Sequence, residues 1–172
     1  DLAKITSLRS GEIKFGEKII TIPAEANVKS FLKNADAKYV LFGIPEDIGV
    51  RANFGRPGAA SAWESALKSI VNIQHNRFCK GDDLIILGQL DVAEEMKLVE
   101  TLDFQNTQDR KLLSDLVSKI DKEVVHIIST IINAGKKPII IGGGHNNAYG
   151  NIKGTALAKG SPINAINFDA HS

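Results

Sequence analysis

Four short runs of apolar residues predict β-strands that are buried on both faces. Each run is nearly continuous, the pattern of parallel strands that have helices on both sides. The runs occupy residues 39–44, 84–88, 138–141 and 163–168. We therefore expect these four segments to be neighbouring parallel strands of one sheet.

Helical patterns fall between the apolar runs. Residues 58–71 are rich in Ala, and residues 108–133 repeat apolar side chains close to every 3.6 positions. Asn106 or Thr107 can cap the start of the longer segment. A third helix is expected over residues 147–159. Strands that alternate with helices predict an α/β fold, a three-layer α/β/α sandwich with a mostly parallel sheet.

The first part of the chain has a different pattern. Residues 12–15 and 18–22 resemble strands, and Gly16-Glu17 between them predicts a short antiparallel hairpin, followed by a helical turn. We therefore divide the chain into an N-terminal extension over residues 1–38 and one α/β domain over residues 39–172.

Composition narrows the class of protein. The 172 residues include 21 basic and 20 acidic side chains, a net charge of +1. Binding to nucleic acid or to an anionic membrane requires a clustered basic excess, which this balance disfavours. No apolar stretch approaches the roughly 18 residues of a membrane span. The charge balance and the lack of a membrane span predict neither nucleic-acid nor membrane partners. The single Cys79 cannot form an intramolecular disulfide, which favours a cytoplasmic protein.

A glycine-rich turn follows the third apolar run. The residues there are Gly142-Gly143-Gly144-His145. A dinucleotide-binding fingerprint would need a third spaced glycine where Asn147 stands, so the motif is incomplete. What remains is an imidazole at the carboxyl end of a strand, where open α/β sheets bind their ligands.

A carboxylate and a second imidazole follow the fourth apolar run. Asp169 and His171 are two positions apart, so in a strand they face the same side. A right-handed crossover from the preceding strand would bring His145 to the same edge. Mixed nitrogen and oxygen donors suit a divalent transition metal, and Mn²⁺ when carboxylates predominate. We predict that His145, Asp169 and His171 are metal ligands.

These paired motifs resemble those of the ureohydrolase superfamily, which includes arginase, agmatinase and formimidoylglutamase. Residues 46–59 are also similar to the loop after the first strand in formimidoylglutamases, and the resemblance extends from Tyr39 to Ser172. It implies an enzyme that uses two Mn²⁺ ions to hydrolyse a C–N bond of a formimidoyl or guanidino group. The substrate so implied is N-formimidoyl-L-glutamate, an intermediate of histidine degradation, which is cleaved to glutamate and formamide. Relatives commonly form homo-oligomers.

The resemblance also assigns roles to individual residues. It implies that His145 binds one metal ion, that His171 binds the other, and that Asp169 bridges them. The metal ions would activate a water molecule for attack on the amidine-like carbon. Asn53 and Arg56 become candidates to hold the substrate's carboxylate, since the planar fork of arginine can bond a carboxylate through two hydrogen bonds.

The sequence departs from the family pattern at several points. Asn146 follows His145, where relatives usually have Ser, Asp or Glu, and the later Asp-x-Asp pair of the family does not occur. We therefore expect these residues to form the first part of a longer protein, with weak metal binding and little hydrolysis by themselves. Three alternatives remain: a protein of this fold that has lost catalysis and serves in binding or assembly, an arginase- or agmatinase-type hydrolase of another guanidino compound, and a nucleotide-binding α/β module.

Overall fold

One parallel sheet organises the molecule. The computed structural model describes residues 1–169, in which four strands lie in the order β1-β3-β2-β4 and every pairing is parallel. Parallel neighbours cannot be joined by a tight turn, and each of the three connections between successive strands contains at least one helix. The strands are β1 (Ile20–Thr21), β2 (Tyr39–Gly43), β3 (Leu84–Gln89) and β4 (Lys137–Ile141).

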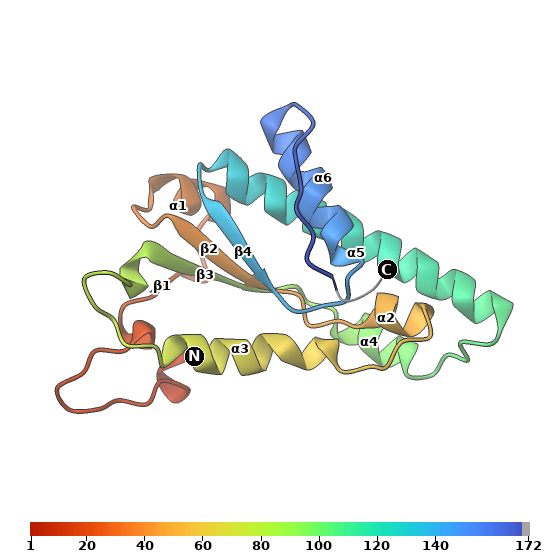
Figure 1. Ribbon diagram of the computed structural model, residues 1–172, viewed down its shortest axis with the longest axis horizontal. Helices are drawn as coiled ribbons and strands as arrows, with labels where there is room; N and C mark the ends of the chain where they lie inside the picture. Colours follow the sequence, from red (N-terminus) through yellow and green to blue (C-terminus); the bar gives the residue numbers. More distant parts are fainter. Residues whose placement is uncertain (170–172) are drawn as a thin grey trace.

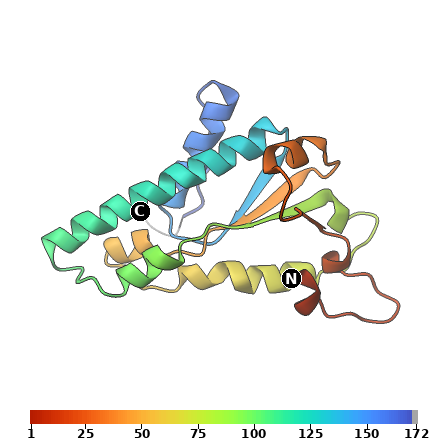
Figure 2. The same ribbon diagram turned by 180° about the vertical axis from the view of Figure 1, so that it is seen from behind.

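Helices cover both faces of the sheet (Figures 1 and 2). Helix α3 lies along one face, and α1, α5 and α6 lie over the other. This arrangement confirms the predicted α/β sandwich with a mostly parallel sheet. The α-helices of residues 1–169 are α1 (Val28–Asn34), α2 (Ile48–Ala52), α3 (Ala62–Val71), α4 (Ala93–Val99), α5 (Thr107–Asn133) and α6 (Asn147–Lys159), and short 3-10 turns span Leu2–Lys4, Phe15–Glu17, Ala59–Ser61 and Gly81–Asp83.

Successive side chains of the central strands enter opposite halves of the core. Val40 of β2 packs with Leu32 of α1 and Ile131 of α5. Its neighbour Leu41 points to the other face and packs with Trp63 of α3. This alternation explains why the strand sequences are continuously apolar, because each face of the sheet is covered.

The predicted N-terminal hairpin is wrong. Ile20 and Thr21 pair in parallel with β3, and residues 15–17 form a 3-10 turn in place of a strand. Phe15 is buried in the same cluster as Trp63. Burial of this aromatic ring against α3 is worth roughly 1.5–3 kcal/mol, which outweighs the weak turn preference of Gly16-Glu17.

The predicted strand over residues 163–168 is also absent. No residue from 162 to 169 joins a ladder with any residue that the structure describes, and Ile166 and Phe168 are 84% and 96% exposed. The outer edge of β4 is open within residues 1–169, but residues 162–169 do not pair with it, so their backbone forms no ladder and their apolar side chains stay exposed. The fourth strand of the described sheet is instead β1.

Helix α5 is 27 residues long, enough to cross a bilayer, but it carries charged side chains along its length. No helix in the described residues is both long and apolar enough to span a membrane.

Candidate functional site

The carboxyl ends of β2 and β4 lie side by side and carry the chemistry-bearing residues. β2 pairs with β4 from Tyr39 to Gly43, and the Ile44 amide continues the pairing by donating to the Ile141 carbonyl at 3.0 Å. The loop after β2 therefore begins beside the turn after β4. One loop contains Glu46 and the other His145.

The turn after β4 depends on glycine. Gly142 and Gly143 have φ angles of +90° and +84°, which side chains disfavour. A Cβ on Gly143 would also lie 2.3 Å from Nδ2 of Asn147. The His145 carbonyl accepts the Ala148 amide at 3.0 Å, so His145 stands at the start of α6. The backbone thus presents this imidazole at the edge of the sheet, as predicted.

His145 and Asp169 are brought together across the segment that follows α6. His145 Nδ1 lies 3.2 Å from Asp169 Oδ2, and the two side chains are 54% and 24% exposed. Residues 162–169 return from the end of α6 toward its start (Figure 1). His171, the third predicted ligand, lies outside the described residues.

The donor pair fits a divalent transition metal. An imidazole nitrogen and a carboxylate oxygen, partly exposed and close together, are the donor types that Mn²⁺ and its neighbours accept. Within residues 1–169 no group of three His, Cys, Asp or Glu side chains could hold a metal ion, so the described part contains two members of such a set.

The two candidate substrate residues lie on the loop after β2. Asn53 caps the end of α2, and Arg56 is exposed on the following loop. Asp47 closes this loop: its Oδ1 accepts from Arg51 Nε at 2.6 Å, and its Oδ2 accepts the Gly58 amide at 2.7 Å. The structure thus places Asn53 and Arg56 on one loop at the predicted edge, held by a buried carboxylate.

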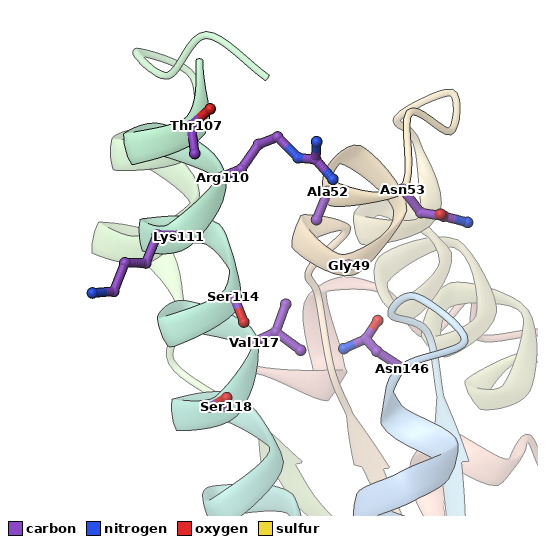
Figure 3. A pocket seen from close by; sticks show the side chains of 10 residues that line it. All are labelled: Gly49, Ala52, Asn53, Thr107, Arg110, Lys111, Ser114, Val117, Ser118 and Asn146. Carbon is purple, nitrogen blue, oxygen red and sulfur yellow. The ribbon is translucent and has the colours of Figure 1, made fainter. Parts of the chain in front are cut away.

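A cavity of about 580 Å³ opens beside the turn that carries His145. It lies between α2, the first half of α5 and Asn146, as Figure 3 shows. Asn53 lines it, whereas Arg56 does not. Polar side chains and two cations, Arg110 and Lys111, predominate on the α5 side, which suits a small polar ligand. The lining residues are Gly49, Ala52, Asn53, Thr107, Arg110, Lys111, Ser114, Val117, Ser118 and Asn146.

Arg110 is a lining residue that sequence reasoning missed. Its side chain extends from α5 across the cavity toward α2 (Figure 3), and its guanidinium lies 5.2 Å from the centre of the Phe54 ring. Phe54 has a φ of +57°, uncommon for a residue other than glycine. The sequence did contain a signal for Arg110. A positive charge near the start of a helix is unfavourable next to the helix dipole, so an arginine there indicates a role other than helix stability.

Glu46 was missed as well. Its side chain is fully buried, and one oxygen, Oε1, accepts from the Gly144 amide at 3.0 Å and from the side-chain amides of Asn146 and Asn147. The other oxygen accepts the Ile48 amide at 2.7 Å. Nothing in the sequence around Glu46 distinguishes it from a solvated loop carboxylate.

Comparison with known sequences identifies relatives. The family model described as Arginase family matches residues 37–172. Formimidoylglutamases of Salmonella paratyphi C and Salmonella choleraesuis are each 32% identical over 143 residues, which covers 82% of this chain and 38% of theirs. The chain therefore spans about two-fifths of the length of these relatives.

Solved structures show the same fold. A formiminoglutamase of Trypanosoma cruzi, crystallised with Mn²⁺, superposes with a TM-score of 0.52 at 17% identity, covering 86% of this chain and 41% of that one. An arginase superfamily protein of Trypanosoma cruzi gives 0.51 at 18% identity, covering 87% and 41%. The family match over most of the chain, the similar sequences and the shared fold agree: this chain belongs to the arginase family.

Proposed function

We propose that this chain forms part of the active site of a metal-dependent hydrolase that cleaves N-formimidoyl-L-glutamate to glutamate and formamide. The observation that carries the proposal is the approach of His145 to Asp169 at the carboxyl edge of the sheet. The formimidoylglutamase relatives support this choice of substrate.

His145, Asp169 and His171 would hold Mn²⁺ in this proposal. Bound divalent metals of this kind lower the pKa of water and so provide a nucleophile at neutral pH. The protein's own contribution is positional: His145 is fixed at the start of α6, and Asp169 is brought to it by the returning segment. The side chains of His145 and Asp169 both remain partly exposed, so a small molecule can approach them.

The substrate would be held by its charges. Glutamate derivatives carry carboxylates, which match the guanidinium groups of Arg56 on the loop and Arg110 in the cavity. Asn53 lines the same cavity and can donate through its amide. Arg110 lines the same cavity as Asn146, the residue that follows His145, which supports its role as a second carboxylate-binding residue.

The test is hydrolysis by the full-length protein. We expect formamide release from N-formimidoyl-L-glutamate that requires added Mn²⁺ and is abolished by EDTA. His145→Ala should lose most activity, whereas His126→Ala removes an exposed imidazole on α5 and should retain it. An active His145→Ala protein would contradict the proposal. Urea release from arginine or agmatine would identify the guanidino alternative, and Mn²⁺ binding without turnover would favour the non-catalytic one.

A further inference from the structure

Glu46 joins the two loops that form the candidate site. It lies three residues beyond β2, yet its Oε1 accepts the amide of Gly144, which directly precedes His145. The same oxygen accepts from Asn146, which directly follows His145. One carboxylate oxygen therefore binds the chain on both sides of the candidate metal ligand.

The turn around His145 is closely packed against its surroundings. Gly142 and Gly143 have positive φ angles, and a Cβ on any of the three glycines would lie within 3.2 Å of a neighbouring atom. A buried carboxylate is stable only where donors surround it, and Glu46 receives four of them. Three of those donors belong to Gly144, Asn146 and Asn147, so the carboxylate joins the turn to the start of α6.

The second oxygen of Glu46 extends this connection to the other loop. It accepts the amide of Ile48, the first residue of α2, and α2 ends at the candidate substrate residue Asn53. The carboxylate thus fixes the metal-ligand turn relative to the substrate loop.

We propose that Glu46 is a positioning residue: its carboxylate orients His145 for metal binding and holds the metal-ligand turn in register with the substrate loop. This inference rests on the proposed function. We assign Glu46 no direct contact with metal or substrate, because its side chain is fully buried and both of its oxygens accept hydrogen bonds from the protein.

The neighbouring Asp47 is a matched control. It is as buried as Glu46, but its hydrogen bonds go to Arg51 and Gly58, within its own loop. Asp47→Asn therefore disturbs the substrate loop without releasing the turn that carries His145. Glu46→Gln keeps the shape of the side chain but places an amide NH₂ against a backbone N–H on one side.

The experiment measures metal affinity and turn rigidity in the full-length protein. We expect Glu46→Gln to weaken Mn²⁺ binding by about 10–100-fold, because mutation of a residue that orients a metal ligand typically has an effect of this size. The EPR signal of free Mn²⁺ measures this affinity. Hydrogen exchange of the Gly144 amide should become faster. Asp47→Asn should leave Mn²⁺ affinity and Gly144 exchange unchanged, and instead raise KM.

Unchanged Mn²⁺ affinity in Glu46→Gln would overturn the proposal. If that variant does not fold, Asn147→Ala removes one donor to the same oxygen and leaves the carboxylate in place, and unchanged affinity there overturns the proposal equally. Failure of the proposed function gives a different result: a wild-type protein that binds Mn²⁺ but hydrolyses no amidine, with the effect of Glu46→Gln on binding still measurable.

Discussion

The carboxyl group of Asp121 on α5 is affected by the charge of Glu46, which lies on the loop after β2. Burial raises the pKa of Asp121, and the negative charge of Glu46 raises it further, while Lys153 lowers it. Oδ1 of Asp121 is buried without a hydrogen-bond partner in the described residues. The folded protein therefore holds this proton more tightly than the unfolded chain, and Asp121 contributes less stability as pH rises through its titration range.

Replacing Asp121 by Asn should stabilise the protein at neutral pH. Relative to wild type, the gain should be below about 1 kcal/mol, because solvent screens a partly exposed group. It should vanish below about pH 3, where the carboxyl is protonated in both folded and unfolded states. Thermal unfolding of both proteins across this pH range measures the difference. A variant that is less stable at neutral pH would contradict the assignment.

Gly143 gives a second prediction at the scale of the residue. Gly143→Ala combines a positive φ with a Cβ 2.3 Å from Asn147, so we expect a loss of more than about 2 kcal/mol. Gly11→Ala is the control: its φ of +79° is similar, but nothing lies within 4 Å of the added Cβ. Urea unfolding of both variants separates backbone strain from the contact, and equal losses would show that the contact with Asn147 is unimportant.

Elements were predictable where a single local signal dominated. Helices α5 and α6 begin and end within one residue of their predicted bounds. In α5 the Asn106 cap coincides with apolar periodicity, and α6 stops before Gly160, which adopts a left-handed conformation. β2, β3 and β4 follow from continuous apolar runs. The run at residues 163–168 has the same appearance but does not pair with the open edge of β4, and apolar pattern alone cannot tell a paired segment from an unpaired one.

The candidate site was also predictable only where its residues carry a local signal in the sequence. The position of His145 was predictable because a glycine turn after a strand is a local feature. Asp169 approaches His145 as predicted, although the strand from which that prediction was made is absent. Glu46 and Arg110 were missed because their roles arise from contacts with residues far away in sequence. Glu46 meets Gly144, and Arg110 reaches the Phe54 ring.

Helix α6 packs against α5 through glycines. Its buried residues are Asn147, Gly150 and Gly154, and a Cβ on Gly154 would lie 2.8 Å from both Ile128 Cβ and the Val125 carbonyl oxygen. The glycines allow a close approach of the two helices that any side chain would prevent.

Gly154→Ala should therefore destabilise the protein. Alanine favours helix over glycine by about 1 kcal/mol, but overpacking against the backbone of α5 costs typically about 1–3 kcal/mol. We expect a lower melting temperature by differential scanning calorimetry. A higher one would mean that helix propensity outweighs the packing of α6 on α5.

At the scale of the whole molecule, metal binding should be linked to stability. A ligand that binds the folded state at 100 times its Kd stabilises it by about 2.7 kcal/mol. We expect Mn²⁺ to raise the unfolding temperature of the full-length protein and EDTA to reverse the shift. His145→Ala should abolish the shift without changing the metal-free midpoint, because the His145 side chain is half exposed. A shift that persists in this variant would place the metal elsewhere.

The hydrogen bond between Glu46 and Gly144 also constrains when the site can form during biosynthesis. The two residues are 98 positions apart in the chain. At translation rates of about 5–20 residues per second, the ribosome needs roughly 5–20 s to proceed from one to the other. Throughout that interval the Glu46 carboxylate remains hydrated and the edge of β2 that will receive β4 stays open. The hydrogen bond that links the two loops of the candidate site therefore cannot form until the turn after β4 has been synthesised.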